Sequence, residues 1–205
     1  MINKTLLKNK YGKEKVFIVP YNNTINIPNG FTNIKHDKNI WSKFDSVGKY
    51  VYRYDAEGDK AMQQIIPYII IINKDKNKIF TTKRIGGESR LLNQISIACG
   101  GHINEEDGLK QPLFYAAVRE LFEEVDIKTN SPFEIFGYVR GLESSTNDHL
   151  GVAIYVHATG EVSVKEKDNL IGEWMDLDQL VYNYHKLENW SQYIVDFFVS
   201  KDKIY

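Results

Sequence analysis

The first sixty residues combine short apolar runs with polar turns. Residues 16–20 (VFIVP) form an apolar, strand-like run that is followed by the turn-forming residues Asn22, Asn23, Pro28, Asn29 and Gly30. Residues 37–47 are compatible with a short helix, and residues 50–54 alternate in the manner of an exposed strand. We find no clear linker after them. We therefore expect residues 1–60 to form a β-containing extension that packs on a main domain of residues 61–205.

The main domain begins with the pattern of a β-hairpin. Residues 65–73 (IIPYIIIIN) are rich in β-branched side chains and short enough for a buried strand. The polar residues 74–77 predict a turn, and residues 78–83 predict the antiparallel partner strand. Residues 95–103 (ISIACGGHI) predict a further strand that is interrupted by two glycines.

The period changes to that of a helix between residues 112 and 125. Pro112 suits the first helical turn, where a missing N–H costs nothing. The apolar side chains lie on one face, at Phe114, Ala117, Val118, Leu121 and Val125.

Strand-like runs return at residues 133–139 and 152–157, and residues 174–182 and 190–199 have helical patterns. Alternation of strand-rich and helical segments predicts an α+β fold of the α/β/α sandwich type, with a mixed sheet between helices.

Composition narrows the class of protein. The 205 residues contain 26 Lys+Arg and 27 Asp+Glu, and this balance argues against a nucleic-acid surface. The longest apolar stretch, residues 65–72, contains a proline and is too short to cross a bilayer. The N-terminus lacks the features of a signal peptide, and the single Cys99 excludes an internal disulfide, so we expect a cytoplasmic protein. One cysteine and five scattered histidines also exclude a zinc-finger framework.

The most informative feature is an acidic cluster on the predicted helix. Glu120, Glu123 and Glu124 fall on one side of it, where they repel one another, and Arg119 can offset only part of that charge. A divalent ion would neutralise them, and all-oxygen ligands suit Mg²⁺ or Mn²⁺ better than zinc. A solvated acidic face is the alternative interpretation. The paired Gly100 and Gly101 upstream favour a ligand site, because glycines let the backbone approach a phosphate closely.

Taken together, Gly100-Gly101 and the run Arg119-Glu120-Leu121-Phe122-Glu123-Glu124 resemble the signature box of the Nudix hydrolases. The resemblance extends from Gln64 to the C-terminus, and IIPYIIII, GGHIN and ENWSQ resemble a bacterial subgroup of the family. It implies a loop–helix–loop in which the three glutamates, with the Gly100 carbonyl, bind Mg²⁺ or Mn²⁺ and Arg119 orients the glutamates. The implied reaction is metal-dependent hydrolysis of a diphosphate bond in a nucleoside diphosphate linked to another moiety.

Three departures from the family pattern concern the box. The loop between the glycines and Arg119 is longer than usual, Gln111 stands where the family carries a glutamate, and Asp126 stands where it usually carries a glycine. Glu105 or Glu106 could substitute for the missing glutamate from the longer loop. No main metal ligand is lost.

Other residues are candidates for substrate contacts and proton transfer. Glu143 and Asp148, in a loop between two predicted strands, are candidates for the general base, although loop carboxylates are often only solvated. Candidates for phosphate contacts are Arg84, Arg90, Gly101 and His102, with His149 a weaker candidate. Surface or structural roles are the alternative for each arginine and histidine. Trp41, Trp174 and Trp190 are most simply packing residues.

Two other functions stay open. Cys99 close to His102 is similar to the arrangement in isopentenyl-diphosphate isomerases, which share the Nudix fold, but the spacing contains an extra glycine. A non-catalytic Nudix-fold sensor of nucleotide metabolites is the other alternative, since a fold does not by itself imply activity. The expected partner is a small nucleotide or phosphorylated metabolite, with neither nucleic acid nor membrane. The extension could cover the pocket or mediate formation of a homodimer.

Overall fold

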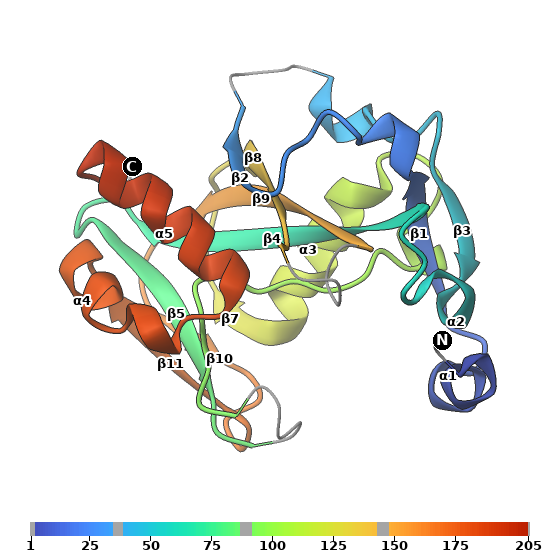
Figure 1. Cartoon of the computed structure of the whole chain (residues 1–205). Coiled ribbons are helices and arrows are strands. Elements are labelled where there is room, and N and C mark those ends of the chain that lie inside the picture. Colours follow the sequence, from blue (N-terminus) through green and yellow to red (C-terminus); the bar gives the residue numbers. More distant parts are fainter. Residues whose placement is uncertain (1–2, 35–38, 87–91, 143–147, 205) are drawn as a thin grey trace.

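The computed structural model describes residues 3–34, 39–86, 92–142 and 148–204 (Figure 1). Its helices are α1 (Lys4–Tyr11), α2 (Arg53–Ala56), α3 (Pro112–Glu124), α4 (Leu177–Tyr182) and α5 (Asn189–Lys201). Its strands are β1 (Lys15–Pro20), β2 (Gly30–Asn33), β3 (Lys49–Tyr52), β4 (Met62–Asn73), β5 (Lys78–Arg84), β6 (Ile95–Ser96), β7 (Val125–Ile127), β8 (Glu134–Arg140), β9 (His149–His157), β10 (Val162–Val164) and β11 (Leu170–Met175). In the described ranges, nine of these strands form one mixed sheet, while β7 and β10 form a separate pair.

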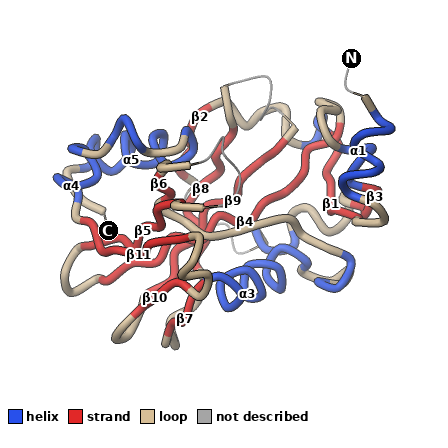
Figure 2. Tube along the Cα trace, turned by 90° about the horizontal axis from the view of Figure 1, so that it is seen from below, coloured by secondary structure: helices blue, strands red, loops and turns tan. Residues whose placement is uncertain are grey.

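Helices cover both faces of this sheet (Figures 1 and 2). Strand β4 explains why, because its side chains alternate between the two faces and all are buried from Gln63 to Ile72. Ile65, Ile69 and Ile71 share a core with α3, whereas Ile70 and Ile72 share one with α4 and α5. Burial of one such side chain contributes about 1.5–3 kcal/mol, so β4 is the centre of the hydrophobic core.

Strands β4 and β5 separate beyond their turn, and the candidate site lies where they separate. Strands β4 and β5 pair only beside their turn, at Ile72↔Ile79 and Asn73↔Lys78. Further along, β6 pairs with β5, and Cys99 forms an isolated bridge to Ile69 on β4. The residues that follow Cys99 are therefore held between the sheet and α3.

The first sixty residues share the sheet with the rest of the chain. Strand β1 is antiparallel both to β3 and to the start of β4, where Ile18 lies opposite Gln64. Strand β2 is antiparallel to β8, and the Arg140 side chain donates hydrogen bonds to the carbonyls of Thr24 and Ile27.

The structure confirms the mixed sheet between helices and most of the predicted elements, but three element predictions were wrong. In place of a helix at residues 37–47, the described part contains only a short 3-10 turn, Ile40–Ser42. The strand predicted to reach residue 54 ends at Tyr52, where α2 begins. Trp174 belongs to β11, where it packs across the strand pair against Phe80, and helix α4 begins only at Leu177.

Sequence patterns also missed α1, β2 and the β7–β10 pair. In the described part of the chain, no helix is long and apolar enough to span a bilayer.

Candidate functional site

Two glycines allow the chain to pass between β4 and α3. Gly100 has a φ of +154°, and a Cβ atom there would lie 1.9 Å from the Pro67 carbonyl oxygen. A Cβ atom on Gly101 would lie 2.5 Å from Oε1 of Glu120. Neither position has room for a side chain, so the backbone comes into direct contact with the carboxylates of α3.

Two of the three glutamates of the motif turn toward these glycines. Oε1 of Glu124 accepts a hydrogen bond from the Gly100 N–H at 3.3 Å, and the Glu120 carboxylate lies against Gly101. The Glu123 side chain is 59% exposed and accepts a hydrogen bond from Arg119 at 3.2 Å. Glu120 and Glu124 thus form the inner acidic pair, and Glu123 stands at its outer edge.

Burial raises the pKa of both carboxylates of the inner acidic pair. Burial and the nearby charge of Glu120 together raise the pKa of Glu124 to about 7, against the opposing effect of the hydrogen bond from Gly100. Burial also raises the pKa of Glu120, against the opposing effect of Arg119. Crowded, partly desolvated carboxylates of this kind are expected where a cation is bound.

The donor set fits Mg²⁺ or Mn²⁺ rather than zinc. Within the described ranges, no three acidic, histidine or cysteine side chains converge into a complete cage. Mg²⁺ does not need one, because it is usually bound through one or two carboxylates together with waters and substrate phosphates. Glu120 and Glu124 offer oxygen ligands of that kind, whereas the contact observed for Gly100 is made by its N–H.

Arg119 holds the arrangement together. Its guanidinium donates to Oδ1 and Oδ2 of Asp107 at 3.0 and 2.9 Å, to the His102 carbonyl at 3.0 Å and to Oε1 of Glu120 at 2.7 Å. These bonds connect the loop that contains His102 and Asp107 to helix α3. The hydrogen bond to Asp107 is the main reason why the pKa of Arg119 lies above its ordinary value.

Asp107 is the residue that sequence reasoning missed. Glu105 and Glu106 were the residues expected to substitute for the family's missing glutamate. Glu105 pairs with Lys15 at 2.8 Å, and Oε1 of Glu106 lies 3.7 Å from Nε of Arg119. Asp107 is 5% exposed and also accepts a hydrogen bond from the Asn104 N–H at 2.8 Å. The spacing of Asn104 and Asp107, typical of a capping box, was a usable signal.

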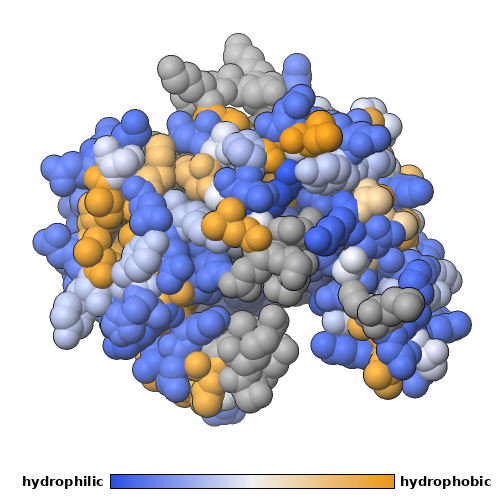
Figure 3. Space-filling view, in the orientation of Figure 1, coloured by the Kyte–Doolittle hydropathy of each residue, from blue (hydrophilic) through white to orange (hydrophobic). Residues whose placement is uncertain are grey.

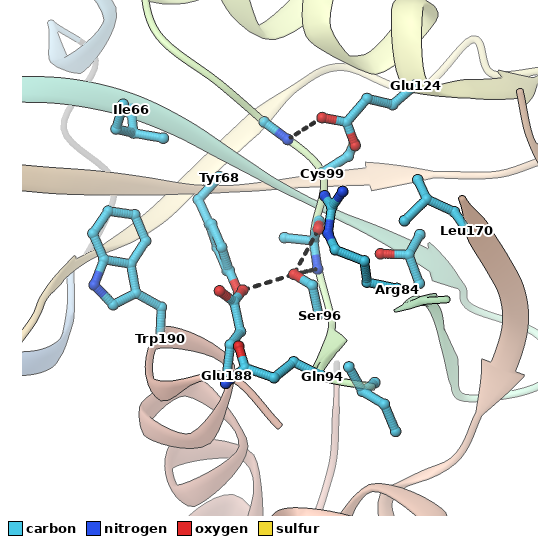
Figure 4. Close-up of a pocket in the computed structure, with 14 residues that line it drawn as sticks. Ile66, Tyr68, Arg84, Gln94, Ser96, Cys99, Glu124, Leu170, Glu188 and Trp190 are labelled. Carbon is cyan, nitrogen blue, oxygen red and sulfur yellow. Dashed lines mark hydrogen bonds between the residues drawn. The ribbon is translucent and has the colours of Figure 1, made fainter. Parts of the chain in front are cut away.

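A cleft of about 250 Å³ opens beside Gly100 and Glu124, where β4 and β5 separate (Figure 4). Arg84, at the end of β5, extends its guanidinium toward the side of the cleft where Glu124 lies. Its positive charge lowers the pKa of Glu124, opposing part of the effect of burial. The cleft is lined by Ile66, Tyr68, Thr82, Arg84, Gln94, Ile95, Ser96, Ala98, Cys99, Gly100, Glu124, Leu170, Glu188 and Trp190.

His102, His149 and Asp148 form a separate hydrogen-bonded row. Nε2 of His102 lies 3.3 Å from Nε2 of His149, whose Nδ1 lies 2.9 Å from Oδ1 of Asp148. Burial, together with the charge of Arg53, lowers the pKa of His102 to about 2, so its ring is neutral. Burial raises the pKa of Asp148, but hydrogen bonds from His149 and Gly58 outweigh it and hold the pKa below its ordinary value. With both oxygens engaged, Asp148 is poorly placed to accept a proton from water.

The remaining candidates lie elsewhere or outside the described part. Arg90 and Glu143 fall outside the described residues. Gln111 precedes α3 in a left-handed conformation, and Asp126 is exposed on β7. The Cys99 thiol is buried and donates to the Ile69 carbonyl, and burial raises its pKa well above the ordinary value. Such a thiol is a poor acid–base group at neutral pH, which weighs against the isomerase alternative.

Comparisons with known proteins indicate the family and the fold of the chain. A family model described as NUDIX domain matches residues 62–198. Protein YmaB of Bacillus subtilis (strain 168) is 34% identical over 167 residues, which are 77% of this chain and 81% of YmaB. The crystal structure of Tm1382, a proposed Nudix hydrolase, has a TM-score of 0.78 at 25% identity and covers 92% of this chain and 100% of Tm1382. A bifunctional NMN adenylyltransferase/ADP ribose pyrophosphatase from Francisella tularensis, in complex with AMP and a Mn ion, shares the fold (TM-score 0.50, 12% identity, 68% of this chain and 42% of that one).

Proposed function

This chain belongs to the Nudix family and is a hydrolase, and on that premise we propose that it cleaves a diphosphate bond in a nucleoside diphosphate linked to another moiety. One observation carries the proposal. The inner acidic pair lies against two glycines, and Glu124 and Gly100 line a cleft that also contains Arg84. Carboxylates for a cation and an arginine for phosphate are the groups that a diphosphate requires.

We assign the metal-binding role to Glu120, Glu124 and the Gly100 carbonyl, with Glu123 at the outer edge, and expect Mg²⁺ or Mn²⁺. A bound ion of this kind neutralises phosphate charge and lowers the pKa of a coordinated water. The protein's own residues hold the ligands in place. Arg119 restrains Glu120 and the loop of Asp107, and Gly101 leaves the space into which the Glu120 carboxylate fits.

The phosphate end of the substrate belongs beside Arg84. Its guanidinium lies in the cleft on the Glu124 side, where it can make paired hydrogen bonds to phosphate oxygens. His102 and Gly101 remain weaker candidates for this role, and Arg90 stays a prediction outside the described residues. For the proton of the attacking water, Glu120 and Glu143 are the remaining candidates, since Asp148 is already engaged.

A hydrolysis screen tests the proposal directly. The protein is incubated with nucleoside diphosphates linked to sugars, nucleosides or other groups, with Mg²⁺, Mn²⁺ or EDTA. The two products, the nucleoside monophosphate and the phosphorylated second moiety, are then measured. We expect turnover that requires the ion, and about a 10²–10⁴-fold loss of kcat in Glu124→Gln and Glu120→Gln. Glu161→Gln, an exposed carboxylate far along the chain, serves as the matched control. Wild-type turnover in both variants would contradict the ligand assignment.

The same proteins and compounds distinguish a hydrolase from the non-catalytic sensor. A sensor would bind these compounds in titration calorimetry without forming nucleoside monophosphate under any metal condition. Hydrolysis by the wild-type protein, lost in Glu124→Gln but retained in Glu161→Gln, excludes it.

A further inference from the structure

The cleft contains a second carboxylate that the hydrolytic reaction does not use. Glu188 is the residue that precedes α5, and its carboxylate makes no capping hydrogen bond to that helix. It turns into the cleft instead (Figure 4). Its Oε1 accepts hydrogen bonds from the hydroxyls of Tyr68 at 2.6 Å, Ser96 at 2.7 Å and Ser191 at 3.3 Å.

These contacts fix the Glu188 carboxylate in one orientation. Ser191 is itself held, because its Oγ accepts a hydrogen bond from the Ile97 N–H at 3.0 Å and lies 2.8 Å from the Tyr68 hydroxyl. Tyr68 is 6% exposed and Ser191 is fully buried. All three hydroxyls approach Oε1, and no described residue donates a hydrogen bond to Oε2. The free oxygen therefore remains available as a hydrogen-bond acceptor in the cleft.

The charges in the cleft give it two unlike ends. Arg84 and the inner acidic pair mark the end where a metal-bound diphosphate belongs, whereas a carboxylate at Glu188 would repel phosphate. The neighbouring walls are aromatic, with Tyr68 and Trp190 in edge-to-face contact at 5.5 Å. An uncharged planar ring that donates a hydrogen bond fits this end, because aromatic walls accept a flat π-face and a carboxylate accepts an N–H.

We propose that Glu188 determines specificity by accepting, through Oε2, a hydrogen bond from an N–H group on the nucleobase of the substrate. The preferred substrates then carry a base with an amino group, and bases that offer only acceptors at that position are rejected. The inference rests on the proposed function, since it assigns the nucleoside part of that substrate to the Glu188 end of the cleft. Glu188 is thus a binding residue, while Tyr68, Ser96 and Ser191 are positioning residues that act through it.

Matched substrate pairs test this assignment. Each pair differs by one donor: guanosine against inosine, adenosine against purine riboside, and ribose against 2′-deoxyribose, all as the same diphosphate-linked compound. For the wild type we expect loss of the amino group in one base pair to lower kcat/KM about 10²-fold, mainly through KM. In Glu188→Gln, whose amide can present a donor instead, we expect that ratio to fall to about threefold or less. Glu161→Gln should keep the wild-type ratio.

Each other result counts against the inference. Equal kcat/KM within both base pairs overturns it while leaving the proposed hydrolysis intact, and a loss confined to the 2′-deoxy compound assigns Glu188 to the sugar. If the wild type hydrolyses nothing, the proposed function fails. Titration calorimetry with the matched nucleoside monophosphates then decides the inference, because it needs no turnover. Should Glu188→Gln not fold, Ser191→Ala replaces it, with a smaller change of the same ratio expected.

Discussion

The guanidinium of Arg119 donates hydrogen bonds to the Asp107 carboxylate, the His102 carbonyl and two glutamates of α3. Asp107 is almost fully buried, and Arg119 is 17% exposed in its side chain, so little solvent screens the pair. Removing one partner of a buried pair leaves the other charge without compensation.

Replacement of Asp107 by Asn should therefore lower both stability and activity. We expect the free energy of unfolding to fall by about 3 kcal/mol, and kcat to fall because Glu120 loses its restraint. Urea denaturation and the hydrolysis assay measure the two effects. Glu106→Gln is the matched control, since its carboxylate is 67% exposed and lies 3.7 Å from the same guanidinium. Equal effects of the two substitutions would show that Asp107 is not the anchor.

The lowered pKa of His102 should make the stability of the protein depend on pH. Its pKa is lowered from 6.5 to about 2 in the folded protein by burial and by nearby Arg53 and His149, so the unfolded chain binds the proton more readily. The folded state is thus favoured above pH 6.5, and stability is lost as the pH falls, by about 1.4 kcal/mol per unit. Urea denaturation between pH 5 and 8 should show this slope, and His102→Asn should flatten it. The exposed His185→Asn is the control; an unchanged slope in His102→Asn would refute the assignment.

Cys99 separates hydrolase from isomerase chemistry. The thiol is 4% exposed and engaged with the Ile69 carbonyl, so it contributes packing rather than proton transfer. We expect Cys99→Ala to keep the kcat of hydrolysis within about twofold and to cost about 1 kcal/mol of stability. Complete loss of activity in a folded Cys99→Ala protein would revive the isomerase alternative.

At the scale of single residues, the site residues that could be predicted from the sequence are those that belong to one compact motif. Gly100, Gly101, Arg119 and the three glutamates belong to that class. Glu188 does not, because its role depends on which way the start of a helix turns its side chain. For Asp107, the capping-box spacing indicates the turn but not the pairing with Arg119. The residues next to Glu188 in the sequence do not indicate that its carboxylate faces the cleft.

At the scale of elements, the passage of residues 100 and 101 between β4 and α3 is the critical packing contact. Gly100 meets the carbonyl of Pro67, which is backbone and cannot move alone, whereas Gly101 meets the Glu120 side chain. The two glycines should therefore respond differently to substitution.

Gly101→Ala should leave a folded protein with a displaced Glu120 carboxylate, because the added methyl group occupies its place. We expect weaker Mn²⁺ binding by titration calorimetry and about a 10²-fold lower kcat, with little loss of stability because the group displaced is the end of a flexible side chain. Gly100→Ala should lower stability further, because the collision there is with backbone. Gly160→Ala is the control for Mn²⁺ binding, since a Cβ atom there meets nothing within 4 Å; its φ of +105° should lower stability but leave the Mn²⁺ affinity unchanged. Unchanged Mn²⁺ affinity in Gly101→Ala would contradict the geometry.

The ends of helices and strands could be predicted where the capping residues and the hydrophobic period indicate the same boundary. Pro112 and the apolar period placed α3 correctly, and the β-branched run placed β4. The boundary between β11 and α4 was missed although Asp176 and Gln179 form a capping box that marks the helix start. Leu170, Trp174 and Met175 are apolar in a strand as they would be in a helix, so period alone could not separate the two.

At the scale of the whole molecule, sheet order lay beyond sequence patterns. Strand β4 is parallel to β9, which follows about 80 residues later, from Gln64↔His149 to Ile72↔His157. No local pattern specifies such a pairing, because it depends on burying both faces of β4 at once. Strand β1 likewise pairs with the start of β4, although the two are distant in the sequence. The N-terminal segment is therefore part of the sheet that supports the cleft.

We therefore predict that residues 61–205 do not fold by themselves, although the family model begins at Met62. Val16, Phe17, Ile18 and Val19 are all 3% exposed or less, and the burial of four such side chains contributes about 6–12 kcal/mol, close to the whole stability of a typical domain. Arg140 would also lose the carbonyls of Thr24 and Ile27, leaving a buried cation without its hydrogen bonds.

Two truncations test this. Removal of residues 1–60 should give an aggregated or unfolded chain by size-exclusion chromatography and circular dichroism. Removal of residues 1–10 should shift Tm by only a few degrees, because helix α1 has no buried residue. A cooperative, monomeric 61–205 fragment with a Tm near that of the full chain would instead make the first sixty residues a separable extension. In that case their contribution would have to be sought in the cleft rather than in the core.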